Sequence, residues 1–231
     1  MMHPLIQKLY KKIIVSTQAY SDTPLFGPTY MKAMAESALK GGAAGIRACY
    51  KADIAAIRSL GEFPLIGIDK VDPALKSGVF ITPNITSAIN VIEAGADIVG
   101  VDARINQHRS YQELYNLLKE IKSLYPDILI MADCVDFKDA QYAEASGLVD
   151  ILATTLSEVV ISGKPDLALI NAMKSELSLP VNGEGGIWEL GDLKAVLAAG
   201  ADMVTIGTAI SRPHLITERF VLFNEKTRGE R

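Results

Sequence analysis

The chain has 231 residues, of which 49% are hydrophobic, and a formal net charge of −4 at pH 7. This length and apolar content are enough for one large core, so we expect residues 1–231 to form a single domain. The slightly acidic charge gives no general attraction to nucleic acid or to an anionic membrane. An anionic small molecule would have to be held by a few local basic residues.

Cysteine usage and the N-terminal segment both indicate a soluble, cytoplasmic protein. Only Cys49 and Cys134 are present, which is too few for a disulfide framework and lacks the spacing of metal ligands. Residues 1–12 are polar and basic, without an apolar run of signal-peptide length. No later run approaches the length of a membrane span.

A recurring pattern joins an alanine-rich helix to an apolar strand through a glycine. It is clearest at residues 93–102 and 198–207, and weaker copies occur at residues 40–47 and 145–152. Glycine accepts the left-handed conformation that commonly ends a helix, and the apolar run that follows is too short for another helix. We interpret these sites as helix-to-strand joints.

Further strand-like runs cover residues 13–16, 64–68, 128–132 and 180–183, and helical patterns follow, for example at residues 111–124 and 167–177. Continuous apolar strands that alternate with amphipathic helices indicate a parallel sheet covered by helices. About eight strand-and-helix units fit the chain, at spacings of roughly 20 to 33 residues. We therefore predict an α/β fold, a (β/α)8 TIM barrel. An open doubly wound sheet with fewer strands is the alternative.

In such a barrel the functional residues lie at the carboxyl ends of the strands. The polar or glycine positions that follow the apolar runs are Gln18, Arg47, Asp69, Lys70, Asp102, Asp133, Thr154, Thr155, Glu184, Gly207 and Arg212. The last two strand ends run into small-residue turns that open helices, which leaves backbone N–H groups free to bind a phosphate. Gly186, Gly207 and Thr208 would supply these groups, and Arg212 would add a cation. Tight turn geometry alone is the alternative explanation.

Lys70 and Glu184 are the predicted catalytic pair. A lysine that follows residues 64–69 would point into the mouth of the barrel, where it would act as a base or form an imine. Glu184 stands at the end of the seventh strand and is a second acid–base candidate. The simpler explanations are a solvent-exposed loop lysine and a carboxylate that caps or pairs locally.

Gln18, Arg47, Asp102, Asp133 and Thr154 are predicted to contact substrate. The guanidinium of Arg47 would stabilise developing negative charge, Gln18 would bind a sugar hydroxyl or an amide, and the aspartates would orient hydroxyls or a positive base. An ion pair between Arg47 and an aspartate, a glutamine that ties loops together and an aspartate that anchors strands are the alternatives.

The histidines do not suggest a metal site. All three, His3, His108 and His214, lie away from the predicted strand ends. Zinc or iron would therefore have too few ligands, and we predict no metal. A hard-cation site formed by the carboxylates of Asp102 and Asp133 alone is the alternative.

Eight short segments at the predicted strand ends stand in the order IVSTQA (14–19), GIRA (45–48), PLIGIDK (64–70), FITP (80–83), IMAD (130–133), TTLS (154–157), EG (184–185) and GTAISRP (207–213). In order and position they resemble the N-acetylmannosamine-6-phosphate 2-epimerases of bacterial sialic acid catabolism, over nearly the whole chain. The resemblance implies that Lys70 is the catalytic lysine, that Glu184 is its acid–base partner, and that Gln18, Arg47, Asp133 and Arg212 contact substrate.

The same resemblance implies the reaction. It is the interconversion of N-acetyl-D-mannosamine 6-phosphate and N-acetyl-D-glucosamine 6-phosphate through loss and return of the C2 proton, without a cofactor. It also suggests a homodimer. A barrel enzyme that uses Lys70 to form a Schiff base and a non-catalytic sugar-phosphate-binding barrel are the alternatives.

Three places depart from the family pattern. Residues 158–160, Glu-Val-Val, follow Ser157 where the family has Gly-Tyr-Thr and a longer loop. Val71 follows Lys70 in place of a basic residue, and Gly186 follows Gly185 in place of a polar or basic one. These changes predict a divergent member with altered substrate preference or reduced activity.

Overall fold

The structure, a computed structural model, describes residues 2–71 and 79–229. Eight parallel strands close into a barrel in which each pairs with its neighbours in sequence and the last pairs with the first. The predicted (β/α)8 barrel is confirmed, and the open-sheet alternative is wrong. The strands are β1 (Ile13–Thr17), β2 (Gly45–Cys49), β3 (Leu65–Ile68), β4 (Ile98–Asp102), β5 (Leu129–Asp133), β6 (Ile151–Ala153), β7 (Val181–Glu184) and β8 (Met203–Ile206).

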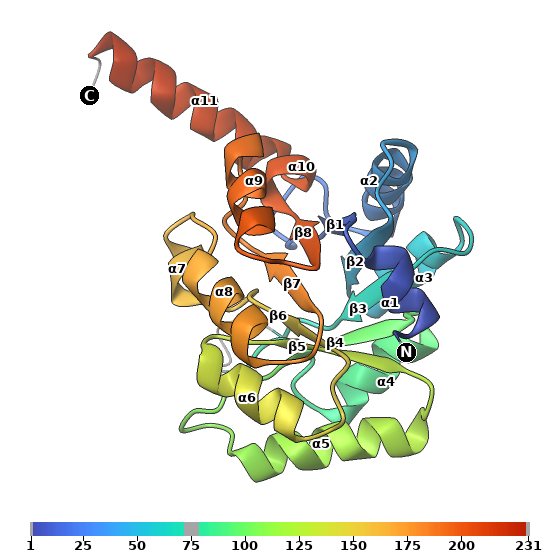
Figure 1. The fold of residues 1–231 in the computed structure, drawn as a ribbon. Helices are drawn as coiled ribbons and strands as arrows, with labels where there is room; N and C mark the ends of the chain where they lie inside the picture. The colour runs from blue at the N-terminus through green and yellow to red at the C-terminus, as the bar shows by residue number, and fades with distance from the viewer. Residues whose placement is uncertain (1, 72–78, 230–231) are drawn as a thin grey trace.

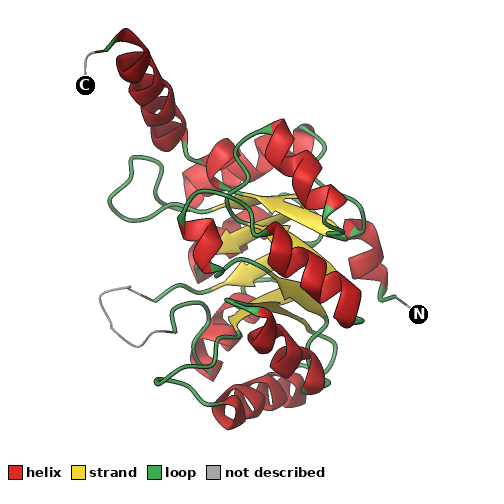
Figure 2. Ribbon diagram, turned by 60° about the vertical axis from the view of Figure 1, so that its left-hand side comes forward, coloured by secondary structure: helices red, strands yellow, loops and turns green. Residues whose placement is uncertain are grey.

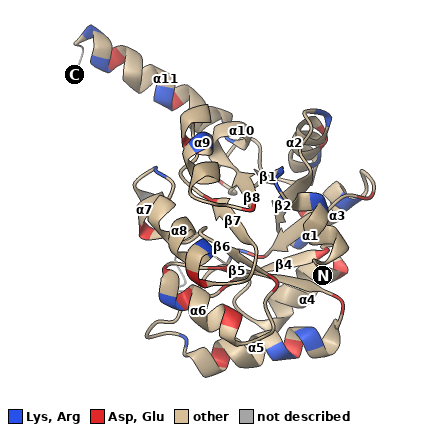
Figure 3. Ribbon diagram, viewed as in Figure 1, with Lys and Arg blue, Asp and Glu red and all other residues tan. Residues whose placement is uncertain are grey.

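Helices surround the barrel (Figure 1). They are α1 (Pro4–Leu9), α2 (Pro28–Lys40), α3 (Lys51–Arg58), α4 (Ile85–Glu93), α5 (Tyr111–Leu124), α6 (Phe137–Ala145), α7 (Glu158–Ile161), α8 (Leu167–Glu176), α9 (Leu190–Ala198), α10 (Thr208–Ser211) and α11 (Pro213–Arg228). The helix expected at residues 111–124 is α5, and the one expected at residues 167–177 is α8. Basic and acidic residues are interspersed along α5 and α11 (Figure 3).

The amino end of the barrel is closed by α1. Its Ile6 and Leu9 are buried in one apolar cluster with inward-facing strand residues such as Ile14, Ile98 and Met203. A larger cluster fills the space between the barrel and its helices. The lower interior is therefore apolar and filled, and the polar strand ends lie at the opposite, carboxyl end.

Three of the four helix-to-strand joints predicted from the repeated pattern, those at residues 93–102, 145–152 and 198–207, share one arrangement around an aspartate. Asp202, just before β8, accepts a hydrogen bond of 2.9 Å from the Val181 N–H of β7 and pairs with Lys174 of α8 at 2.8 Å. The same three-part contact recurs around two other aspartates, as Leu65–Asp97–Arg58 and Ile130–Asp150–Lys122. Each aspartate stands just before one strand. It therefore links the start of that strand to the neighbouring strand that comes earlier in the chain, and to the helix that leads into this earlier strand.

The last helix does not lie along the barrel. Figures 1 and 2 show α11 projecting away from the body of the molecule. None of its described residues is buried, and Phe220 and Phe223 are 73% and 72% exposed. Within the described ranges, no helix combines the length and the apolar character that a membrane crossing requires.

Candidate active site

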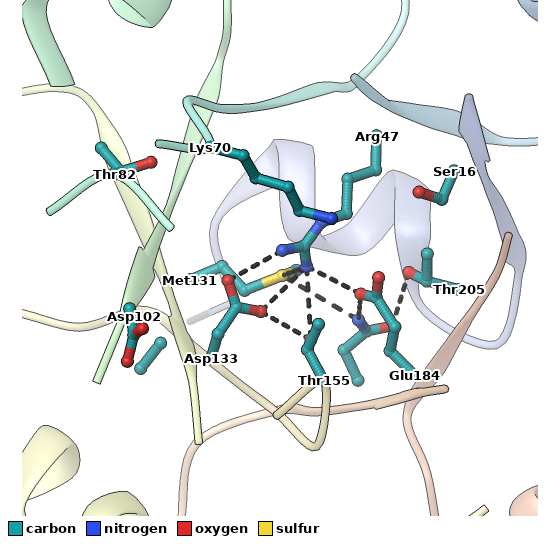
Figure 4. Close-up of polar contacts among 12 residues, drawn as sticks. Ser16, Arg47, Lys70, Thr82, Asp102, Met131, Asp133, Thr155, Glu184 and Thr205 are labelled. Carbon is teal, nitrogen blue, oxygen red and sulfur yellow. Dashed lines mark hydrogen bonds and ion pairs between the residues drawn. The ribbon is translucent and has the colours of Figure 1, made fainter. Parts of the chain in front are cut away.

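A buried ion cluster lies at the carboxyl end of the barrel (Figure 4). The Arg47 guanidinium of β2 has no exposed surface and donates to both carboxylate oxygens of Asp133, at 2.9 and 2.8 Å. Its Nη1 also donates to Glu184 Oε2 at 2.7 Å. The two parallel bonds to Asp133 are the strong, directional geometry of an arginine–carboxylate pair. One guanidinium therefore holds two carboxylates that come from β5 and β7.

Burial and neighbouring charge together set the protonation of this cluster. Burial alone would lower the pKa of Arg47, but Asp133 and Glu184 outweigh it and raise that pKa, so the guanidinium stays charged. Burial raises the pKa of Glu184, Arg47 opposes this effect and the Asp133 charge adds to it. The net result is a Glu184 pKa above its usual value. Glu184 therefore keeps a proton to higher pH than an ordinary glutamate, which suits a general acid.

The strand β7 places two polar side chains on the inner face because alternate residues of a strand face the same way. Asn182 Nδ2 donates to Glu184 Oε2 at 3.1 Å, and Thr205 of β8 donates to Asn182 Oδ1 at 3.0 Å. Asn182 and Thr205 were not among the predicted site residues. The alternation of the Val-Asn-Gly-Glu run was the signal that could have identified Asn182.

The two threonines after β6 have different positions. Thr154 donates through Oγ1 to the Glu184 carbonyl at 3.0 Å and accepts from the Glu184 N–H at 3.1 Å, so it holds the backbone of β7. Thr155 donates to Asp133 Oδ1 at 2.6 Å and lines the cavity described next. Of the two, it is Thr155 that reaches the site, whereas Thr154 was the predicted substrate contact.

A cavity of about 240 Å³ opens above the ion cluster. It brings together seven of the eleven predicted site residues, namely Gln18, Lys70, Glu184, Gly186, Gly207, Thr208 and Arg212. Arg47 and Asp133 are not in its lining and have no exposed surface, and they form the ion pair that was the other interpretation of Arg47, one compatible with stabilising negative charge. The remaining two, Thr154 and Asp102, lie outside the lining as well.

Asp102 holds loops together. Its buried carboxylate accepts from Arg104 Nε at 3.0 Å and from the Phe80 N–H at 3.2 Å, and it lies 3.5 Å from Arg109. These contacts fit the alternative in which one of the two aspartates anchors neighbouring segments.

Gln18 presents an acceptor that the protein does not use. Its Nε2 donates to Ser16 Oγ at 2.6 Å, whereas its buried Oε1 has no hydrogen-bond partner among the described residues. Buried polar atoms are nearly always satisfied, so a ligand N–H or O–H in the cavity would complete this contact.

The two departures from the family pattern near β7 fit each other. Gly185 and Gly186 have φ values of +100° and +67°, which side chains rarely adopt. A Cβ at Gly186 would stand 2.1 Å from the Lys164 carbonyl carbon, and one at Gly185 would stand 2.3 Å from Val160. The segment after Ser157 therefore packs directly on the glycine turn, and Val160 lines the cavity. A polar side chain at residue 186 would displace this segment.

Tyr20 lies between the two cations of the site. Lys70 Nζ donates to its hydroxyl oxygen at 3.5 Å, and the Arg212 guanidinium lies 4.8 Å from the centre of its ring. Burial would raise the pKa of Tyr20, but the charges of Lys70 and Arg212 outweigh it, so the pKa lies below its usual value. Tyr20 was not predicted, because it lies in a loop two residues beyond Gln18 where no pattern marks it.

Metal ligands are not gathered in the part of the chain that the structure describes: no group of three or more His, Cys, Asp or Glu side chains is placed to hold an ion there. Cys49 and Cys134 are buried free thiols. Burial raises the pKa of Cys49 to about 11, so this thiol is poorly reactive at neutral pH.

Comparison with known proteins finds a family profile and relatives that match most of the chain. A family profile described as "Putative N-acetylmannosamine-6-phosphate epimerase" matches residues 31–226. A protein of Caldanaerobacter subterraneus subsp. tengcongensis, named "Putative N-acetylmannosamine-6-phosphate 2-epimerase", is 40% identical over 99% of this chain and 97% of its own length. A protein of the same name from Shouchella clausii is 36% identical over 95% of this chain and 98% of its own length.

Two solved structures are also similar. The N-acetylmannosamine-6-phosphate 2-epimerase from Clostridium perfringens superposes with a TM-score of 0.86 at 30% identity, over 96% of each chain. Thiamine phosphate pyrophosphorylase from Pyrococcus furiosus has a TM-score of 0.60 at 19% identity, over 88% of each chain, and shares the fold alone.

Proposed function

Because the chain belongs to the N-acetylmannosamine-6-phosphate epimerase family, we propose that it interconverts N-acetyl-D-mannosamine 6-phosphate and N-acetyl-D-glucosamine 6-phosphate as a cofactor-independent isomerase. The observation that supports this most directly is the cavity in which Lys70 and Glu184 share one lining with Arg212 and the glycine turns. One end of this cavity suits proton transfer, and the other suits a phosphate.

The reaction inverts C2 of the open-chain sugar, where the C2 hydrogen is α to the C1 aldehyde. The Lys70 amine takes the C2 proton while the electrons of the C–H bond move into the carbonyl, which gives an enolate. Glu184 then delivers its proton to the opposite face of C2 and the carbonyl re-forms. Proton exchange with water returns both groups to their starting states. In the alternative, Lys70 serves both faces after the intermediate turns.

The other residues divide between binding and support. Gly186, Gly207, Thr208 and Arg212 would hold the phosphate, and the free Oε1 of Gln18 would accept from a sugar hydroxyl or the amide. Arg47 acts as a positioning residue because it is sealed below the cavity and reaches the sugar only through Glu184. Asp133 and Thr154 likewise stabilise the position of the cluster and of β7.

The test is turnover of N-acetylmannosamine 6-phosphate in deuterium oxide. We expect epimer that carries deuterium at C2, and a loss of at least about 10²-fold in Lys70→Ala. Lys40→Ala, which removes a lysine that is 76% exposed, is the matched control and should retain full activity. Epimer without deuterium at C2 would rule out the deprotonation mechanism. Borohydride added with substrate should leave Lys70 unmodified, since no imine forms.

We further propose that the protein works in the cytoplasm as a homodimer. The support for a dimer is α11, which projects from the body of the molecule (Figure 1). Its Phe220 and Phe223 are largely exposed. Leu190 and Leu197 on α9 are also exposed, by 85% and 48%. A second copy of this chain, which carries the same exposed apolar side chains, is the partner that would cover them symmetrically.

A further inference from the structure

A second cavity, of about 260 Å³, adjoins the one described above and shares Lys70 with it. Its lining carries four aromatic rings, those of Tyr20, Phe26, Tyr50 and Phe80. The first cavity is lined mainly by glycine turns and polar or charged side chains. The two cavities therefore meet at Lys70 but offer different chemistry, one polar and one aromatic.

Tyr50 indicates that the aromatic lining has a function. Its backbone has φ +69°. This conformation is unfavourable for any residue that has a side chain, whereas glycine adopts it without strain. The Tyr50 N–H donates to the Ile68 carbonyl at 3.0 Å, and the ring meets that of Phe26 edge to face, with centroids 6.3 Å apart. A strained tyrosine whose ring lines a cavity beside the catalytic lysine points to a role for that ring.

Tyr20 connects the aromatic cavity to the phosphate end. Its hydroxyl lies 3.5 Å from Lys70 Nζ, and its ring lies 4.8 Å from the guanidinium of Arg212. One ligand can therefore touch Arg212, Lys70 and the aromatic rings at the same time. Such a ligand has an anion at one end, a reacting carbon in the middle and an apolar group near that carbon.

We propose that the aromatic cavity is the subsite for the N-acyl group of the substrate, and that it accepts acyl chains longer than acetyl. This inference rests on the proposed function. C2 carries both the proton that Lys70 removes and the nitrogen that bears the acyl group, so an acyl group must lie close to Lys70. The phosphate end of the first cavity is occupied by C6 and its phosphate. Among the described residues, the aromatic cavity is a second space that Lys70 lines, and its volume of about 260 Å³ leaves room for an acyl group larger than acetyl.

The position of this subsite fits inversion at C2. With the phosphate held at one end and the acyl group at the other, the planar intermediate stays in place while the proton leaves one face and returns to the other. The acyl group has the same contacts before, during and after the reaction. Its binding energy should therefore lower KM and leave kcat unchanged.

The experiment measures kcat and KM for the N-acetyl, N-propanoyl and N-butanoyl derivatives of mannosamine 6-phosphate. Burial of each added methylene should lower KM about twofold to fourfold, with kcat constant. In Tyr50→Gly the gain per methylene should fall to less than half of that in the wild-type protein, since the cavity loses a wall. Glycine suits φ +69°, so this variant should keep the backbone conformation of the turn.

Two further variants test the assignment of the cavity. Ser21→Leu places a side chain in the same cavity and should reverse the trend, so that KM rises with acyl length. Asn116→Leu changes a separate cavity, near α5, and should leave both constants as in the wild type for all three substrates.

The outcomes separate the two proposals. Only the acyl subsite is wrong if the wild type turns over the N-acetyl substrate but its KM rises with each methylene. The same conclusion follows if the KM values of Tyr50→Gly and Asn116→Leu depend on acyl length in the same way. If none of the three substrates is epimerised, the proposed function is wrong and the subsite is wrong with it.

Discussion

Arg47 is the residue on which the site depends, because its two bonds to Asp133 and one bond to Glu184 use the fork shape of a guanidinium. Arg47→Lys keeps the charge but cannot make this set of bonds, and it leaves buried carboxylate oxygens without donors. We expect the free energy of unfolding to fall by about 2–4 kcal/mol and kcat to fall at least tenfold. Urea denaturation and initial rates measure both. Arg219→Lys, at an exposed pair with Glu189, should change neither.

Asp53, in the first turn of α3, gives a pH-dependent prediction. The residue is buried, its Oδ2 has no partner among the described residues, and burial raises the pKa of its carboxyl to about 6. Because the pKa in the folded state exceeds that in the unfolded state, the folded state binds the proton more tightly. The contribution of the protonated carboxyl to the free energy of unfolding is therefore present near pH 4 and is lost as the pH rises through about 6.

Asp53→Asn mimics the protonated carboxyl at every pH. It should have the stability of the wild type near pH 4 and be more stable by up to about 2 kcal/mol at pH 8. Thermal or urea unfolding at both pH values measures this. A wild-type protein that equals or exceeds the variant at pH 8 would show that the carboxylate has a partner that stabilises it.

At the scale of elements, the aspartate joints connect neighbouring strands through side chains as well as backbone. Asp202→Asn keeps one acceptor but removes the charge that pairs with Lys174 across a mostly buried contact. We expect a loss of about 1–3 kcal/mol in the free energy of unfolding by urea. Glu36→Gln, which removes an exposed pair with Lys40, is the control and should have no measurable effect. Equal effects of the two variants would contradict a special role for the joints.

The glycine turn after β7 and the segment that covers it form a second unit. Gly186→Ala introduces a Cβ that collides with the backbone of Lys164, and alanine disfavours φ +67°. We expect this variant to bind inorganic phosphate more weakly, and we expect faster proteolytic cleavage within residues 158–165. Gly163→Ala, where φ is also positive but no atom lies near the added Cβ, separates backbone strain from collision. If the two variants behave alike, packing of the segment is not what matters.

Sequence patterns identified the elements better than the directions of individual side chains. Apolar runs and glycine joints were enough to predict the alternation of strands and helices, because burial and helix ends leave local signals. Whether Thr154 or Thr155 faces the cavity depends on how β6 ends, and whether Arg47 meets substrate or Asp133 depends on contacts between strands far apart in the chain. Tyr20 reaches Lys70 only because the barrel closes. Such contacts leave no local pattern.

At the scale of the whole molecule, α11 provides the test of assembly. Phe220→Glu combined with Phe223→Glu places charges on the exposed apolar surface of this helix. We expect the wild type to sediment as a dimer and the double variant as a monomer in analytical ultracentrifugation. Glu218→Gln combined with Lys226→Gln, on the same helix, is the control and should remain dimeric. A monomeric wild-type protein at micromolar concentration would contradict the homodimer.

That residues 1–231 form one domain also stays a prediction.

The helix α1 has a kinetic consequence. Ile6 and Leu9 fill the amino end of the barrel, and the cavity beside Lys70 and Glu184 lies at the carboxyl ends of the strands. Both epimers would bind in this one cavity, and they differ only in the configuration of one carbon. The two sugars are therefore mutually exclusive ligands, and each competes with the other for the empty enzyme. Net flux in either direction should slow as product accumulates, well before the reaction reaches equilibrium.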